Sequence, residues 1–126
     1  MNDALLTRVL VDSNRMLLNG QSHPRLLGVL LVEFVSIESV YIINWIPEQG
    51  EDIYIVAAPP NTIATVEVPR EEGVDLTPTI KKVPFDEYRL RTNQLSKESK
   101  RKLAIVARLW SSGAYQGGAG KGDRSI

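Results

Sequence analysis

The sequence predicts a single α+β domain over residues 1–114: an N-terminal helix, an antiparallel sheet of four to five strands, and a C-terminal helix packed on one face. Three observations predict this class. An apolar stripe with helical spacing opens the chain, several short strand-like runs follow closely, and a second helical stripe lies near the end. The runs are joined by segments shorter than the roughly dozen residues that a parallel crossover needs, so antiparallel pairing is expected.

The length and composition are those of an ordinary globular domain. The chain has 126 residues, of which 43% are apolar and 24% charged. It has no cysteine, which removes disulfides, thiol catalysis and thiolate metal sites from consideration. The N-terminus lacks a basic start followed by an apolar core, so we expect a cytoplasmic protein without a membrane partner.

Residues 3–19 are expected to form the first helix. Asp3 can cap its start, and Asn19-Gly20 can end it. Residues 11–14 are poor helix formers, so two short strands joined at Ser13-Asn14 are an alternative. The helix interpretation depends on the spacing of six apolar side chains: Leu5, Leu6, Val9, Leu10, Met16 and Leu17.

Five stretches are expected to form strands. LLGVLLVEFV (26–35) is apolar on both faces, which is typical of a strand at the centre of a sheet. SVYIINWI (39–46), DIYIVAA (52–58) and TIATVEV (62–68) are rich in β-branched or aromatic residues. TIKKVPF (79–85) carries paired lysines and a proline, which suit an exposed edge strand.

The C-terminal helix is expected over residues 96–110, after one helical turn within 86–95. Ser96 is a good N-cap, and Glu98 lies in the first turn, where a carboxylate is favoured. The rest of the chain, residues 115–126, is expected to be a flexible Gly-rich tail. The apolar stripe of the helix predicts that Val106 and Trp110 are buried against the sheet; it consists of Leu103, Val106, Ala107 and Trp110.

No catalytic, cofactor-binding or metal site is predicted, so we expect no enzymatic activity. The segment GGAGKGD differs from a phosphate-binding loop, because Tyr115 replaces its first glycine and Gly122 replaces the Ser or Thr after the lysine. His23, the only histidine, is expected to be a solvated loop residue. Glu51 and Asp52 are adjacent on a strand and should point to opposite faces, so they cannot act together on one bond.

The charges are unevenly distributed along a neutral chain. Residues 1–80 carry four basic and eleven acidic side chains, and residues 81–126 carry eleven basic and four acidic ones. Such polarity can steer a charged partner. An acidic sheet that faces a basic helix within the fold would produce the same pattern.

The segment NWIPEQGEDIYIV (44–56) is the best candidate for a binding surface. Pro47 and Gly50 are sufficient to form its turn, so the turn does not require the carboxylates beside them. Aromatic side chains beside acids can anchor a protein interface. We therefore predict a partner-binding surface made of Glu48, Glu51, Asp52, Glu71, Glu72, Asp75, Trp45 and Tyr54.

The order of features over residues 39–110 resembles immunity proteins of bacterial polymorphic toxin systems, including contact-dependent inhibition. These features are an acidic hairpin (IINWIPEQGEDIYIV), a strand ending in arginine (TIATVEVPR), an isolated Tyr88 and a closing basic-to-apolar helix (SKESKRKLAIVARLW). The resemblance implies a non-enzymatic protein that neutralises a cognate toxin by occluding its active site. It also implies that the acidic turn meets a basic toxin, such as a nuclease.

Two other functions remain open. The first is a nucleic-acid-associated protein that uses the basic helix. The second is a structural or assembly subunit that pairs exposed strand edges with copies of itself. The cations of the first alternative are Lys97, Lys100, Arg101, Lys102 and Arg108.

Overall fold

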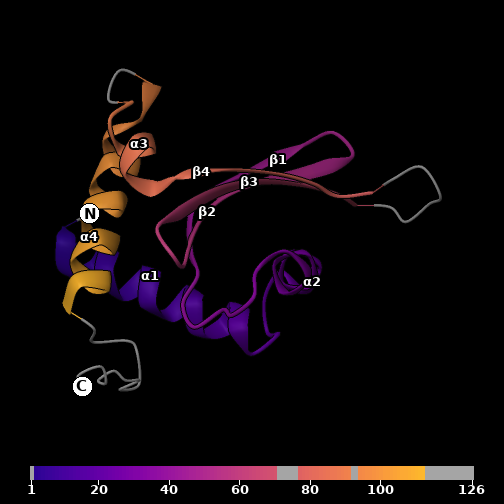
Figure 1. Cartoon of the computed structure of the whole chain (residues 1–126), viewed down its shortest axis with the longest axis horizontal. Coiled ribbons are helices and arrows are strands. Elements are labelled where there is room, and N and C mark those ends of the chain that lie inside the picture. The colour runs from indigo at the N-terminus through magenta and orange to yellow at the C-terminus, as the bar shows by residue number, and fades with distance from the viewer. Residues whose placement is uncertain (1, 71–76, 92–93, 113–126) are drawn as a thin grey trace.

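The protein is represented by a computed structural model that describes residues 2–70, 77–91 and 94–112 (Figure 1). These residues form four helices and four strands. In chain order they are α1 (Asp3–Leu18), α2 (Pro24–Glu33), β1 (Tyr41–Glu48), β2 (Glu51–Ala58), β3 (Thr62–Pro69), β4 (Thr79–Pro84), α3 (Phe85–Arg89) and α4 (Lys97–Ser112).

The four strands form one antiparallel sheet in the order β1-β2-β3-β4. Each strand pairs with its neighbour in sequence, as the short connections predict. The α+β class, the antiparallel sheet and the two terminal helices are therefore confirmed. The strands expected at 39–46, 52–58, 62–68 and 79–85 all form, with ends that differ by at most two residues.

The prediction of a central strand over residues 26–35 is wrong, because this segment is helix α2. A continuous apolar run of this length does not distinguish a buried strand from a helix. The signal for a helix lies just before the run: Pro24 is at the first position of α2, where a proline costs no hydrogen bond. Glu33, near the end of the expected strand, is instead the last residue of α2, and its Oε1 lies 3.4 Å from Lys82 Nζ.

Helix α1 is continuous, so the alternative of two short strands is wrong. Its N-cap is Asn2 rather than Asp3, because Asn2 Oδ1 accepts a hydrogen bond from the Leu5 backbone at 2.9 Å. Its end at Asn19, followed by Gly20 with a φ of 76°, is as predicted. Asn14, a poor helix former in mid-helix, accepts a hydrogen bond from the Val40 backbone at 2.6 Å, so its role is tertiary.

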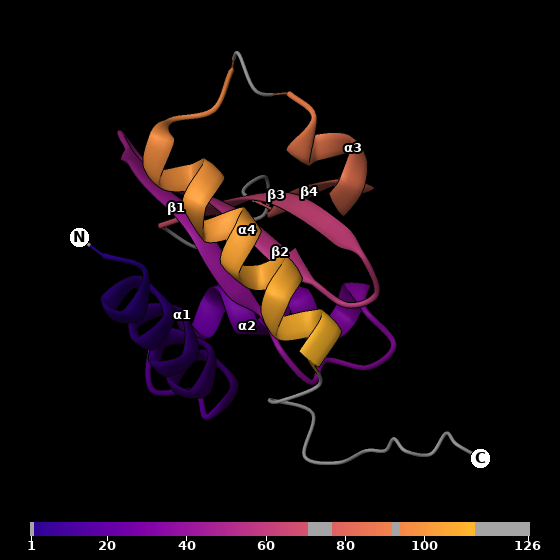
Figure 2. The same ribbon diagram turned by 90° about the vertical axis from the view of Figure 1, so that its left-hand side faces the viewer.

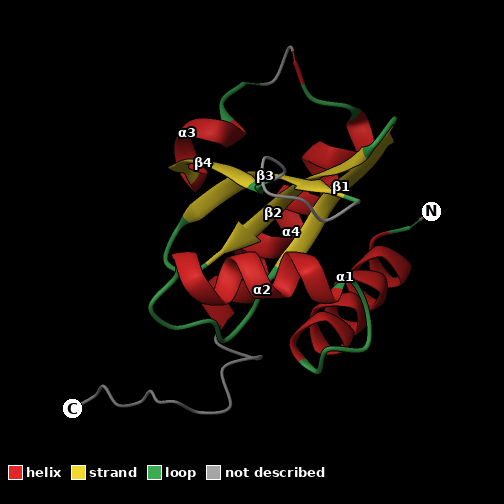
Figure 3. Ribbon diagram, turned by 90° about the vertical axis from the view of Figure 1, so that its right-hand side faces the viewer, coloured by secondary structure: helices red, strands yellow, loops and turns green. Residues whose placement is uncertain are grey.

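Helices cover both faces of the sheet (Figures 2 and 3). Helix α4 lies across one face, and α2 lies on the opposite face; α1 contributes to both cores. The α4-side core consists of Leu6, Leu10, Tyr41, Ile43, Ala57, Ile63, Phe85, Leu103, Ile105 and Val106. The α2-side core consists of Leu17, Leu26, Leu30, Val40, Tyr54, Val56, Ala58, Ala64, Val66 and Val68.

Helix α4 begins as predicted, because Ser96 Oγ accepts a hydrogen bond from the Ser99 backbone at 3.0 Å. Val106 is fully buried, as expected. Trp110 is only half-buried: its ring packs against Phe85 at 5.0 Å between centroids, and its Nε1 donates to Ser39 Oγ at 3.0 Å. The expected Gly-rich tail at 115–126 lies outside the described residues. None of the described helices has the length and apolar character needed to cross a membrane.

Candidate functional site

A β-bulge in β1 determines where Trp45 points. Ile42 pairs with Val56, but the next paired residue is Asn44, opposite Ile55, so Ile43 is an extra residue in β1. Strict alternation would place Trp45 on the α4 side with Tyr41 and Ile43. The bulge instead places Trp45 opposite Tyr54, on the α2 side.

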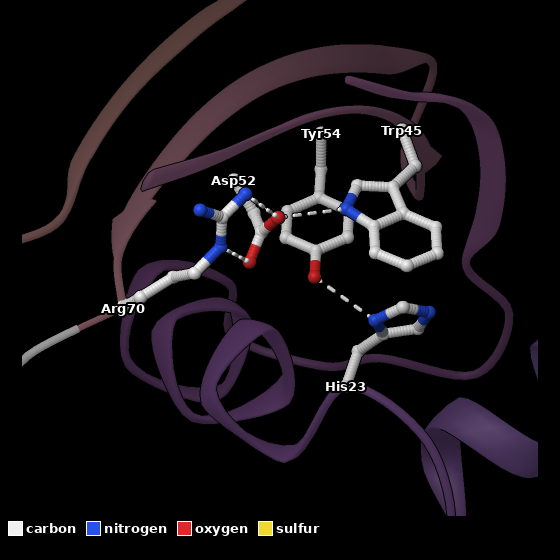
Figure 4. A network of polar contacts seen from close by, with 5 residues as sticks. All are labelled: His23, Trp45, Asp52, Tyr54 and Arg70. Atoms are coloured by element: carbon white, nitrogen blue, oxygen red, sulfur yellow. Dashed lines mark hydrogen bonds and ion pairs between the residues drawn. The ribbon is translucent and has the colours of Figure 1, made fainter. Parts of the chain in front are cut away.

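Three aromatic rings meet at this place (Figure 4). The rings of Trp45 and Tyr54 are nearly parallel, with an interplanar angle of 9° and centroids 6.1 Å apart. The His23 ring meets both edge-on, at 4.9 Å from Trp45 and 5.1 Å from Tyr54. A hydrogen bond of 2.9 Å joins His23 Nδ1 to Tyr54 Oη, so the loop before α2 is tied to β2.

Asp52 links the aromatic cluster to Arg70, the residue that follows β3. Its Oδ1 accepts from Trp45 Nε1 at 3.1 Å and from Arg70 Nη2 at 3.1 Å, and its Oδ2 accepts from Arg70 Nε at 3.3 Å. This bidentate hydrogen bonding to Arg70, aided by Trp45, holds the pKa of Asp52 below its ordinary value of 3.8. We call His23, Trp45, Asp52, Tyr54 and Arg70 the Trp45 cluster.

The Trp45 cluster lines a surface hollow of about 450 Å³ between the start of α2 and the sheet. Trp45 is 48% exposed, whereas Tyr54 behind it is only 5% exposed. Burial, together with the negative charge of Asp52, raises the pKa of Tyr54 above 10.0, so its hydroxyl stays protonated. The protonated hydroxyl of Tyr54 and the carboxylate of Asp52, which accepts from two side chains, can keep the neighbouring rings in a fixed position for binding. Neither group is activated for proton transfer.

A scan against models of protein families, a search of curated proteins and a search of solved structures found no match.

The structure brings together three of the residues predicted to bind a partner: Trp45, Asp52 and Tyr54. Glu48 and Glu51 lie apart from them, opposite each other where β1 turns into β2. Neither forms an ion pair or side-chain hydrogen bond within the described part of the chain, whereas Asp52 is engaged by Arg70 and Trp45. Glu71, Glu72 and Asp75 lie outside the described residues.

His23 and Arg70 are the members of the Trp45 cluster that the sequence interpretation missed. His23 is half-buried against two rings rather than solvated in a loop. The available signal was Pro24, because a proline that begins a helix places the preceding residue at its cap. Arg70 is 18 residues from Asp52 in sequence, and only the register of the sheet brings the two together.

The described residues contain no metal site formed by three or more His, Cys, Asp or Glu side chains. The basic run is partly engaged within the fold. Arg101 donates to Asp3 Oδ1 at 2.7 Å, and Lys102 donates to the Ile43 carbonyl at 3.0 Å. Lys97, Lys100 and Arg108 form no ion pair with a described residue.

The edges of the sheet offer little room for another strand. Along β1, Lys102 bonds the Ile43 carbonyl, Asn44 Oδ1 accepts from the Trp45 backbone at 3.0 Å, and Pro47 has no N–H. At the other edge, β4 follows Pro78, ends at Pro84 and carries Lys81 and Lys82. Such features oppose pairing between edges, which disfavours assembly through strand addition.

Proposed function

We propose that the protein is a non-enzymatic protein-binding module and that its docking surface is centred on Trp45. One observation carries the proposal: Trp45 is about half exposed, yet its ring is fixed from behind by Tyr54, His23 and Asp52. Tryptophan, tyrosine and arginine are the residues that most often dominate the binding energy of an interface. A ring that is already held in place loses little conformational entropy when a partner covers it.

The charge at the β1–β2 turn, beyond Trp45 along the hairpin, favours a basic partner. Glu48 and Glu51 face each other across the β1–β2 turn, where like charges destabilise the hairpin slightly. No described cation compensates them, so a partner that supplies lysine or arginine relieves this repulsion. The Asp52–Arg70 pair lies closer to the hollow and serves to hold Trp45 in place.

We propose further that the partner is a cognate bacterial toxin, which this protein neutralises in the cytoplasm. The resemblance over residues 39–110 supports this, together with the exposed acidic turn. The mechanism is occlusion: Trp45 anchors the contact while Glu48 and Glu51 pair with cations that a nuclease toxin uses to hold phosphate. The occupied edge of β1 and the engagement of Arg101 and Lys102 favour this function over strand-edge assembly or nucleic-acid binding.

The test starts from the gene directly upstream in the native genome. Its C-terminal toxin region is co-expressed with this protein, and growth is measured together with association kinetics of the purified pair. Trp45→Ala should weaken binding by at least about 2 kcal/mol if Trp45 is a hot spot, with an effect mainly on dissociation. The double variant Glu48→Gln/Glu51→Gln should slow association at low salt and barely change stability.

Arg108→Gln is the matched control, because it alters an exposed charge on α4, away from the Trp45 cluster. Protection that survives Trp45→Ala and the double glutamate variant unchanged would refute the proposed surface. Failure of the wild type to bind the upstream toxin would refute the proposed partner. A salt-dependent shift of labelled RNA that is lost in Lys97→Gln/Lys100→Gln would instead support the nucleic-acid alternative.

A further inference from the structure

Helix α2 has an apolar outer face in addition to its buried one. Gly28, Leu31 and Val32 follow one another at the three- and four-residue spacing that lines one side of a helix. Leu31 is 60% and Val32 83% exposed, and no described element lies outside this face (Figure 3). A helix that is apolar all round is normally buried on all sides, so this face lacks its partner.

A hollow of about 400 Å³ runs beside this face, between α2 and the sheet. It shares Arg25 and Val68 with the hollow of the Trp45 cluster, so the two join end to end. An alanine Cβ built at Gly28 meets no atom within 4 Å, so a chain seated here can approach the helix backbone closely. We call this hollow the α2 groove; it is lined by Arg25, Gly28, Val29, Val32, Glu33, Val68 and Pro78.

The two charged residues of the α2 groove differ in whether they have a partner of opposite charge. Glu33 is paired with Lys82 at 3.4 Å. Arg25 is half-buried and has no acidic partner among the described residues. A partly desolvated cation in an apolar groove favours an anionic group on whatever occupies it.

We propose that the α2 groove binds an apolar protein segment that carries one carboxylate. The apolar side chains of the segment cover Val32 and the open face at Gly28, and its carboxylate pairs with Arg25. This is helix-in-groove recognition, in which residues one turn apart anchor an amphipathic segment. The inference rests on the proposed function in one respect, namely that the partner is a protein. It adds a second contact surface, which favours an anionic group, whereas the acidic turn favours a cationic one.

The experiment uses the full chain and two capped, fluorescently labelled helical peptides. Both have leucines one helical turn apart, and a single neighbouring residue is Glu in one peptide and Lys in the other. Fluorescence anisotropy should show that the Glu peptide binds at least about tenfold more tightly than the Lys peptide. Arg25→Gln should abolish most of that preference, because it removes the cation that distinguishes the two peptides.

Two variants block the α2 groove without threatening the fold. Gly28→Gln places a side chain in open space on a helix, and Val32→Gln changes an 83% exposed residue. Both should reduce binding of the Glu peptide at least about tenfold. The matched control Val9→Gln alters a half-exposed valine of α1 and should leave binding unchanged. Equal affinity in wild type, Gly28→Gln and Val32→Gln, or no binding by wild type, would overturn the inference.

The Trp45→Ala variant separates this inference from the proposed function. Its peptide binding at the apolar end of the α2 groove should match that of wild type, because Trp45 does not line that hollow. If Trp45→Ala loses toxin binding while Gly28→Gln loses peptide binding, both proposals stand. Toxin binding without peptide binding overturns only the inference, and peptide binding without toxin binding overturns only the proposed partner.

Discussion

Both carboxylate oxygens of Asp52, on β2, accept hydrogen bonds from Arg70, the residue that follows β3. The same carboxylate accepts from Trp45 Nε1, so one acid connects β1, β2 and the segment just after β3. Asp52, which the sequence analysis predicts to contact a partner, is thus engaged in holding the ring that we propose as the anchor. Asp52 therefore has a structural role, whereas Glu48 and Glu51 at the turn are available to contact a partner.

The first prediction concerns stability in acid. Arg70 lowers the pKa of Asp52 in the folded state, so the stabilisation is present above the ordinary value of 3.8 and is lost as pH falls through the folded-state pKa. Asp52→Asn should therefore cost about 1 kcal/mol or less at neutral pH and remove part of the decline below pH 4. Urea denaturation at several pH values measures both. Glu48→Gln is the control, and a decline identical in all three proteins would contradict the prediction.

The second prediction concerns stability in alkali. Burial, followed by the charge of Asp52, raises the pKa of Tyr54 above 10.0. The folded state therefore holds this proton more tightly than the unfolded chain, so the contribution is complete below pH 10 and is lost as pH rises further. Ultraviolet absorbance of phenolate should show a late-titrating tyrosine that disappears in Tyr54→Phe. Tyr88, whose pKa burial also raises, is the control: Tyr88→Phe should leave the Tyr54 titration in place.

The third prediction compares two glycines. Gly28 lies in mid-helix with open space around it, so Gly28→Ala should stabilise the protein by roughly 0.5–1 kcal/mol. Gly50 has a φ of 85° at the β1–β2 turn, a conformation that disfavours side chains. Gly50→Ala should destabilise by about 1 kcal/mol or more. Thermal or chemical denaturation measures both, and shifts of the same sign would contradict the contrast.

The fourth prediction concerns the α4-side core. Leu103 is 1% exposed between α4 and the sheet, so Leu103→Ala should destabilise by about 2–5 kcal/mol. Trp110 is half-buried, so Trp110→Ala should cost less than the roughly 3–5 kcal/mol expected for a fully buried tryptophan. Trp110→Phe keeps part of the packing on Phe85 but loses the bond to Ser39, so it should fall between wild type and Trp110→Ala. Urea denaturation measures the series, and an unchanged midpoint in Leu103→Ala would show that this stripe does not pack on the sheet.

Local patterns were sufficient to predict most of the elements. The strands around Tyr41, Tyr54 and Val66 and the helix around Val106 follow from periodicities that each segment carries by itself. The cap at Ser96 and the stop at Gly20 follow from backbone chemistry within one turn of the chain. The segment at 26–35 was misassigned because α2 is apolar on its exposed as well as its buried face, so it shows no helical stripe.

The sequence by itself determined the α+β class, the antiparallel pairing of consecutive strands and the acidic turn, because these depend on interactions between residues close in the chain. Only the tertiary structure decided the Trp45 cluster. The bulge at Ile43 turns Trp45 toward Tyr54, and the register of β2 with β3 brings Arg70 to Asp52. Both depend on which residues pair across strands, and that pairing is set by packing between segments far apart in sequence, which no local periodicity records.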